Sequence, residues 1–335
     1  MLYDKKHVYI RSPLRISFIG GGTDMESYYL NGNKGHVVSS AVDLYVYIAI
    51  KDMFDANIRV HHSKIETQPI TSRIMHTYTR TALEHFGIFK GAEVVITSDV
   101  MTTGSGLGAS SSLMSALAKG CSNLRDTHSQ SKSNFAELIY SLECKAGTVG
   151  GKQDQYATIF GGLNSISFTD KEVKVNPVKI SLNRKLALES RLLLIFTNLA
   201  RESKQIQLQL DTNIKSKNRE YLDRLKNLSY DFLKVLETES EPIHKVGDLL
   251  HEGWVLKKSS NKASSNQFID QLYDMLRSKG VLGGKIMGAG GGGFFLAFIK
   301  EPSLKQQIKY ELYPNYIAMD VKFAEKGTEV LWKNF

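Results

Sequence analysis

The stretch Gly104-Ser-Gly-Leu-Gly-Ala-Ser-Ser-Ser112, read as GSGLGASSS, stands between a strand-like segment at residues 92–98 and a helix-like one. The helix pattern follows from apolar residues that recur on one face at Leu113, Leu117, Cys121 and Leu124. Glycines let a backbone turn its N–H groups toward an anion, and a helix N-terminus adds unpaired donors and a positive dipole end. The stretch therefore predicts a phosphate-binding loop, with an ordinary run of serine N-caps as the alternative.

Two other nucleotide-binding patterns fit this stretch less well. A Walker A loop requires a lysine after its last glycine, and none is present here. A Rossmann pattern is approached by Gly104, Gly106 and Ala109, with Asp126 as its acidic partner. Asp126 lies in the polar segment NLRDTHSQSKSN rather than at the end of a second strand, where it would have to reach a ribose. A nicotinamide-dependent dehydrogenase is therefore the weaker interpretation.

Two further glycine stretches lie near the two ends of the chain. Residues 11–29, RSPLRISFIGGGTDMESYY, combine a strand, three glycines and Asp24, whose carboxylate could bond sugar hydroxyls or cap the following helix. Residues 283–293, GGKIMGAGGGG, contain seven glycines and precede the apolar run that ends at Phe298. Because glycines cost folding entropy, such a run predicts close approach to a ligand or to another backbone segment.

Together these stretches resemble the three motifs of the galactokinase, homoserine kinase, mevalonate kinase and phosphomevalonate kinase (GHMP) superfamily, in the same order and over nearly the whole chain. PLRISFIGGGTD is similar to the first motif, GSGLGASSS to the second, the ATP phosphate loop, and GKIMGAGGGGF to the third. The resemblance implies a two-domain α+β fold. Its N-terminal domain, like ribosomal protein S5 domain 2, would span residues 1–180, and its ferredoxin-like C-terminal domain residues 181–335.

The resemblance also implies roles for individual residues. Asp154 matches the catalytic aspartate and Arg15 matches an arginine that pairs with it. Mg²⁺ would be ligated by Ser110 and Glu143. The ATP phosphates would be wrapped by Gly104, Ser105, Gly106, Leu107, Gly108, Ala109, Ser110, Ser111 and Ser112. The substrate side would comprise Gly21, Gly22, Thr23, Asp24, Lys152, Arg201, Lys204, Gly290 and Gly291. Without the resemblance, Glu143 reads as a surface acid and Asp154 as a first-turn helix acid.

Within the superfamily, PxRISFxGGGTD, GGKxxGAGGGGF and residues 251–258, HEGWVLKK, most resemble D-glycero-D-manno-heptose 7-phosphate kinases. Galactokinases have an acid and a histidine where Gly21 and Gly22 stand. The resemblance therefore implies phosphorylation of the anomeric hydroxyl of the heptose 7-phosphate by ATP with Mg²⁺, on a route to GDP-heptose and surface polysaccharide. Another sugar-1-kinase, such as an L-fucokinase, and a non-catalytic sugar or ATP sensor are the alternatives.

The composition is that of a soluble globular protein, with 42% hydrophobic and 23% charged residues among 335. The net charge of +9 is dispersed, so no nucleic-acid partner is expected. The start, MLYDKKHVYIRS, has no apolar leader, and no apolar run approaches the roughly 18 residues of a membrane span. We expect a cytoplasmic protein, with a homodimer as the protein partner considered. Cys121 and Cys144 are expected to pack in the core.

Overall fold

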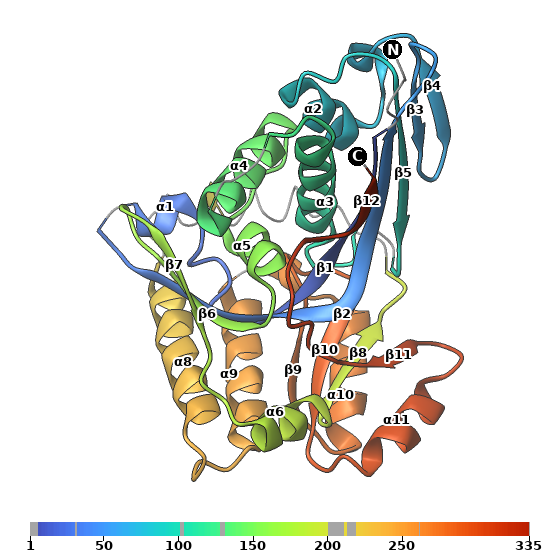
Figure 1. Ribbon diagram of the computed structural model, residues 1–335. Helices are drawn as coiled ribbons and strands as arrows, with labels where there is room; N and C mark the ends of the chain where they lie inside the picture. The colour runs from blue at the N-terminus through green and yellow to red at the C-terminus, as the bar shows by residue number, and fades with distance from the viewer. Residues whose placement is uncertain are drawn as a thin grey trace.

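The computed structural model describes residues 6–30, 32–100, 104–127, 131–199, 211–212, 219–260 and 262–334. The described residues form an eight-stranded sheet and a four-stranded sheet, with helices packed on both (Figure 1). Helices and antiparallel strands are mixed along the chain, as the α+β prediction requires.

The larger sheet is formed mainly by the N-terminal half of the chain. Its main path runs β12 (Glu329–Asn334), β1 (His7–Ile19), β2 (Gly35–Asp52), β5 (Ala92–Ser98), β3 (Ile58–His61) and β4 (Ile65–Gln68). Off this path, β2 also pairs with β6 (Leu163–Phe168), which pairs with β7 (Val173–Pro177). All pairs are antiparallel except β3 with β5. The long strands β1 and β2 are mostly buried, so they give a fixed support to the strands that pair with them and to the helices that pack on them.

One face of β1 and β2 is covered by helix α3 (Ala109–Leu124), which is buried along nearly its whole length. Gly120 allows this close packing, because a Cβ there would lie 2.9 Å from the Ile50 side chain. Beside α3 lie α2 (Thr77–His85), α4 (Lys132–Lys145) and α5 (Gln153–Phe160) (Figure 1). The short elements near them are α1 (Glu26–Tyr29) and the 3₁₀ turn η1 (Thr71–Arg73).

The smaller sheet is fully antiparallel, in the order β11 (Ile317–Asp320), β8 (Leu192–Phe196), β10 (Phe294–Ile299) and β9 (Val281–Ile286). The helices of this half are α6 (Leu182–Glu189), α8 (Glu220–Glu237), α9 (Lys245–Ser260), α10 (Gln267–Ser278) and α11 (Leu304–Leu312), with the 3₁₀ turn η2 (Lys262–Ser264). Helix α9 packs on β9, and α8 packs on α9 and reaches β2. The two helices therefore link the sheets (Figure 1).

The last strand of the chain returns to the larger sheet. β12 pairs with β1 from His7↔Asn334 to Arg11↔Glu329, and this pairing is reinforced by the Arg11–Glu329 ion pair at 2.7 Å. The smaller sheet itself lies within residues 192–320. A domain boundary near residue 180 stays a prediction.

Most of the strands and helices expected from the sequence are present, including the strand at 92–98 and the helix that follows the glycine-serine stretch. Strand β6 and helix α6 had no sequence prediction. The apolar periodicity of residues 202–237 predicts a helix there; its start lies outside the described residues, and α8 accounts for its second half. Cys121 is buried as expected, but the prediction for Cys144 is wrong, because its side chain is exposed near the end of α4.

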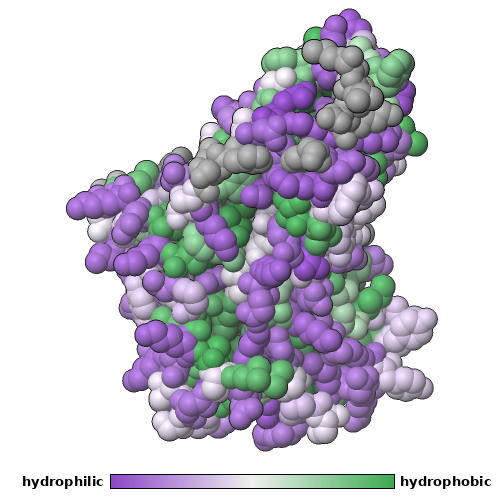
Figure 2. All heavy atoms as spheres, in the orientation of Figure 1, coloured by the Kyte–Doolittle hydropathy of each residue, from purple (hydrophilic) through white to green (hydrophobic). Residues whose placement is uncertain are grey.

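Among the described residues, no helix combines the length and the apolar character needed to cross a bilayer. The face in Figure 2 is mainly hydrophilic, with apolar side chains in separate groups. The apolar residues of β1, β2 and α3 are gathered instead in a shared core.

His36 on β2 is a buried polar residue that fastens the turn after β1. Its side chain is 1% exposed, and its two ring nitrogens lie 2.6 Å from Ser229 Oγ and 2.8 Å from Ser165 Oγ. Its backbone N–H donates to Thr23 Oγ1 at 3.0 Å. Burial lowers the pKa of His36 to about 4, because the charged imidazolium is disfavoured away from water.

This burial predicts an acid-dependent loss of stability. Between pH about 6.5 and pH about 4, His36 binds a proton in the unfolded chain but not in the folded chain. We expect the free energy of unfolding to fall across that window by roughly 3 kcal/mol from this residue alone. His36→Gln should flatten the profile there when urea unfolding is measured from pH 4 to pH 8. Parallel profiles for the two proteins would contradict the assignment.

Candidate active site

A cavity of about 600 Å³ lies where β1, the start of α3, the start of α5 and the β9–β10 turn meet. Its walls contain parts of all three glycine stretches. The predicted site residues that line it are Arg15, Gly21, Gly22, Asp24, Gly104, Ser105, Gly106, Gly108, Ala109, Ser110, Ser111, Glu143 and Asp154. Residues far apart in the sequence are therefore brought to one place.

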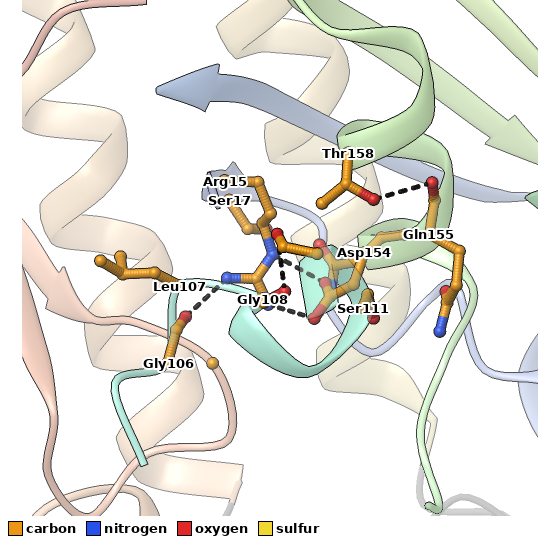
Figure 3. Close-up of polar contacts among 12 residues, drawn as sticks. Arg15, Ser17, Gly106, Leu107, Gly108, Ser111, Asp154, Gln155 and Thr158 are labelled. Atoms are coloured by element: carbon orange, nitrogen blue, oxygen red, sulfur yellow. Dashed lines mark hydrogen bonds and ion pairs between the residues drawn. The ribbon is translucent and has the colours of Figure 1, made fainter. Parts of the chain in front are cut away.

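Arg15 joins three of these elements through its guanidinium group (Figure 3). Its Nε donates to Asp154 Oδ1 at 2.7 Å and its Nη2 donates to Oδ2 at 2.6 Å, so the pair is bidentate. Its Nη1 donates to the Gly106 carbonyl at 2.5 Å, and its backbone N–H donates to the Leu107 carbonyl at 2.8 Å. With Arg15 only 3% exposed, the strand, the glycine-serine loop and helix α5 are fixed relative to one another.

The glycine-serine loop owes its shape to three left-handed glycines, Gly104, Gly106 and Gly108, with φ of 75°, 77° and 72°. Such φ values are disfavoured for residues with a side chain. Gly108 also lies against Arg15, because a Cβ there would be 2.9 Å from Arg15 Cγ. Gly108 is the N-cap of α3 and no side chain caps this helix. The helix N-terminus therefore presents backbone donors to the cavity.

The serines of the loop differ in what they contact. Ser110 is exposed at the cavity wall, and Ser111 Oγ donates to Glu143 at 2.8 Å. Ser112 Oγ donates to the Pro13 carbonyl at 2.6 Å and is fully buried, and the Leu107 side chain is buried in the core. Among the described residues, Leu107 and Ser112 are not part of the cavity wall, so their side chains hold the loop in place.

Glu143 lies on α4 behind the loop and is 2% exposed. Its carboxylate accepts hydrogen bonds from Ser111 Oγ at 2.8 Å, from the Gln155 amide and, at 3.5 Å, from the Tyr78 hydroxyl. Burial raises the pKa of Glu143 to about 7, and these hydrogen bonds work against that rise. Its position is therefore not that of a surface acid, which was the alternative from the sequence.

The turn after β1 forms the opposite wall. Asp24, 2% exposed, accepts from the backbone N–H of Gly22 at 2.8 Å and of Gln153 at 3.1 Å. Burial raises the pKa of Asp24, and the nearby Asp154 carboxylate adds to that effect. Gly151 makes room for this carboxylate, because a Cβ there would lie 2.0 Å from Asp24 Oδ2.

Two residues of this region that were predicted to bind substrate do not line the cavity. Their side chains contact other protein groups. Thr23 is fully buried, and its Oγ1 donates to the Gly20 carbonyl at 2.7 Å and accepts from the His36 N–H. Lys152 pairs with Glu137 at 2.8 Å and with Glu26 at 3.3 Å. Both lie next to wall residues, so they can orient the wall without touching a ligand.

The glycines of the third motif allow two backbone segments to pack closely against each other. A Cβ at Gly290 would lie 2.5 Å from Ser264 Cα, and the Gly291 N–H donates to the Ser264 carbonyl at 3.0 Å. Gly290 and Gly291 are not among the described wall residues, whereas Gly288 and Ala289 are. Of the two explanations that the sequence left open, packing against another backbone segment accounts for Gly290 and Gly291.

Lys285 in β9 is a wall residue that the sequence analysis missed. It is 9% exposed, and its Nζ donates to the carbonyls of Ser17 at 2.9 Å and Phe18 at 3.1 Å. Burial lowers the pKa of Lys285 to about 7, and the charge of Arg15 adds to the shift. A single lysine inside a glycine run that precedes an apolar segment was the signal that could have identified it. Arg201 and Lys204 lie outside the described residues.

Two family profiles match the chain. The GHMP kinases N-terminal domain matches residues 72–162, and the GHMP kinases C-terminal profile matches residues 234–317. With one profile in each half and the three motifs around one cavity, the chain belongs to the GHMP kinase family. It is an ATP-dependent sugar kinase with the two-domain fold of that family.

Individual relatives are similar over almost the whole chain. A D-glycero-alpha-D-manno-heptose 7-phosphate kinase from Campylobacter jejuni is 28% identical over 97% of this chain and 98% of its own length. A bifunctional fucokinase/GDP-fucose pyrophosphorylase from Arabidopsis thaliana is 26% identical, but the match covers 32% of that protein. The crystal structure of a D-glycero-D-manno-heptose 1-phosphate kinase from Bacteroides thetaiotaomicron superimposes with a TM-score of 0.78 over 99% of both chains, at 23% identity.

The contact between the third motif and the phosphate loop predicts that Gly293 cannot be replaced. Gly293 has φ of 84°, and a Cβ would lie 2.4 Å from the Gly104 carbonyl oxygen and 2.5 Å from that of Ser105. Gly293→Ala should lower the free energy of unfolding by more than the roughly 1–2 kcal/mol of a left-handed alanine, and should raise KM for ATP.

Gly162→Ala is the matched control, because Gly162 has φ of 74° but its nearest backbone oxygen is 3.8 Å away. Its free energy of unfolding should fall only by the cost of a left-handed alanine, and its KM for ATP should be unchanged. Urea unfolding and initial rates measure both effects. Equal losses of stability in the two variants would show that the contact with the loop is unimportant.

Proposed function

We propose that the chain transfers the γ-phosphoryl group of ATP to the anomeric C1 hydroxyl of D-glycero-D-manno-heptose 7-phosphate, producing heptose 1,7-bisphosphate for GDP-heptose and surface polysaccharide. The observation that carries the proposal is the bidentate Arg15–Asp154 pair, which lines the same cavity as the uncapped start of α3. A carboxylate and a phosphate-binding helix terminus are the two parts that transfer to a hydroxyl requires.

Asp154 is proposed to accept the proton of the attacking hydroxyl or to orient it. Arg15 holds both carboxylate oxygens in one orientation, and no other rotamer of Asp154 would keep the two hydrogen bonds. In-line phosphoryl transfer depends mainly on positioning and charge neutralisation, so a fixed carboxylate is worth more than a mobile one.

The backbone N–H groups at residues 104–111 are proposed to bind the β- and γ-phosphates. Three left-handed glycines fix the loop, and the dipole of the 16-residue helix α3 favours negative charge at its start. Arg15 lies beneath the loop through its bond to the Gly106 carbonyl, which ties the position of the phosphates to the position of Asp154.

The residues at the start of α3 fit a Mg²⁺ ion. Ser110 is exposed at the wall, and burial raises the pKa of Glu143 to about 7 because the charged carboxylate is disfavoured away from water. A divalent ion bound there would neutralise charge on the transferring phosphates. Ser110 and Glu143 would hold it, with Ser111 and Gln155 orienting the Glu143 carboxylate.

The sugar is proposed to lie against the turn after β1, where Asp24 and the glycines Gly21 and Gly22 form the wall. The heptose 7-phosphate is favoured by the full-length similarity to the Campylobacter jejuni enzyme. An L-fucokinase activity is the second candidate, supported by the similarity to the bifunctional fucokinase from Arabidopsis thaliana. Arg201 and Lys204 are proposed to bind the 7-phosphate. Lys152, the third candidate from the sequence, is paired with Glu137 and Glu26 and lies off the cavity wall, so it is the weaker candidate.

One assay tests the substrate. ADP release from ATP and Mg²⁺ would be measured with D-glycero-D-manno-heptose 7-phosphate, the same heptose without phosphate, L-fucose and D-galactose. We expect the highest kcat/KM for the heptose 7-phosphate. A higher value for L-fucose would replace the proposed substrate, and ATP binding without turnover on any sugar would favour the sensor.

The role of Asp154 is tested by Asp154→Asn. This substitution keeps the size of the side chain but removes the proton acceptor, so kcat should fall by roughly 10²-fold or more. The Kd for ATP should stay close to that of the wild type, because the loop amides are untouched. Near-normal turnover would remove Asp154 from the mechanism.

A further inference from the structure

Several polar side-chain atoms at the cavity wall are buried and have no hydrogen-bond partner. Among the described residues, the wall atoms of this kind are Ser17 Oγ, Gln153 Oε1, Gln155 Oε1 and the Tyr221 hydroxyl. A buried polar group without a partner destabilises a folded protein, so each such atom requires an explanation. Ser17 and Gln153 are of interest because they border the same small space.

Ser17 lies two residues after Arg15 on β1, so both side chains point to the same face of the strand (Figure 3). It is 4% exposed, and its carbonyl is held by Lys285 at 2.9 Å. The strand end that presents Ser17 to the cavity is therefore fixed by a residue from the other sheet.

Gln153 precedes Asp154 at the start of α5. Its backbone N–H donates to Asp24 at 3.1 Å, and its side-chain Nε2 lies 3.5 Å from Asp24 Oδ1. This arrangement leaves its Oε1 as an acceptor without a partner.

Both side chains lie beside Gly21. A Cβ at Gly21 would be 3.5 Å from Gln153 Nε2 and 3.7 Å from Ser17 Oγ, both ordinary contact distances. No other atom of the described residues is within 4 Å of that point, apart from the neighbours of Gly21 in the chain. Ser17 and Gln153 thus both lie beside Gly21 at the cavity wall, and a side-chain atom on Gly21 would contact both of them.

We propose that Ser17 and Gln153 form a subsite that binds one hydroxyl of the acceptor over Gly21 and so contributes to the choice of sugar. The inference rests on the proposed sugar kinase function. A serine hydroxyl can donate, the Gln153 Oε1 can accept, and a sugar hydroxyl can do both at once. An acceptor without a hydroxyl at that position leaves both protein groups unpaired, which is a strong basis for discrimination.

The first test compares Ser17→Ala with Ser39→Ala. Ser39 is directly opposite Ser17 on β2, is fully buried and also has an unpartnered Oγ, but it is not among the described wall residues. Ser17→Ala should lower kcat/KM for the acceptor about 3- to 10-fold, as for the loss of one hydrogen bond, with KM for ATP unchanged. Ser39→Ala should change neither.

Urea unfolding of the same two variants shows whether a loss of activity comes from weaker binding or from a less stable fold. Because neither hydroxyl has a protein partner, both substitutions should leave the urea midpoint unchanged or slightly higher. Equal changes in kcat/KM for the two variants, or a Ser17→Ala enzyme identical to the wild type, would overturn the subsite.

The second test fills the space directly. Gly20 and Gly22 have left-handed φ values but Gly21 does not, so an alanine at 21 suits the backbone. Gly21→Ala should fold with unchanged stability and should lower acceptor kcat/KM at least 10-fold, because its methyl group would project from the backbone into the space of the bound hydroxyl. Wild-type kcat/KM in this variant would contradict the proposal.

The bound hydroxyl is identified with monodeoxy analogues of whichever sugar the wild type phosphorylates. The Ser17→Ala effect should disappear for the one analogue that lacks this hydroxyl and should persist for the others. An effect that persists for every analogue overturns the subsite while leaving the kinase assignment intact. A wild type that neither phosphorylates nor binds any sugar, by calorimetry, overturns both.

Discussion

The position of every other part of the site depends on the guanidinium group of Arg15. It is almost fully buried, and it spans from strand β1 to the carboxylate of Asp154 and the carbonyl of Gly106. A planar group with donors at fixed angles can satisfy a carboxylate and a carbonyl together, which a lysine ammonium cannot do with the same geometry. Because β1 also carries Ser17 and ends in the turn at Gly21, one strand connects the glycine-serine loop, the Asp154 carboxylate and the wall proposed to bind the sugar.

Glycines serve two separate purposes around this strand. Gly104, Gly106 and Gly108 adopt φ values that expose backbone donors, which is the use that a phosphate loop requires. Gly290 and Gly293 instead allow backbone segments to pass within contact distance of Ser264 and of the loop itself. The third motif therefore packs against the second, so the smaller sheet supports the loop that is proposed to bind the phosphates.

The sequence predicted much of this arrangement because its signals are local. The strand at 92–98, the left-handed glycine loop and the helix after it are neighbours in the chain, and the pairing of Arg15 with Asp154 followed from the resemblance. Long-range pairing left no such signal. Nothing in residues 329–334 indicates that β12 joins β1, and the contact of Lys285 with the end of β1 depends on how the two sheets meet. The exposure of Cys144 was missed for a related reason, since a helical period does not show which turn leaves the core.

Two charged groups of the cavity, Asp24 and Lys285, are held mainly by backbone partners, and this has a chemical consequence. Asp24 accepts from two backbone N–H groups, and Lys285 donates to two backbone carbonyls. Backbone partners orient a charge without cancelling it, whereas an ion pair does both. The carboxylate and the ammonium group thus remain able to interact with hydroxyls and phosphates that enter the cavity, and their orientation is fixed before a ligand arrives. Preorganised groups of this kind stabilise developing charge with little rearrangement, which is the main requirement of phosphoryl transfer.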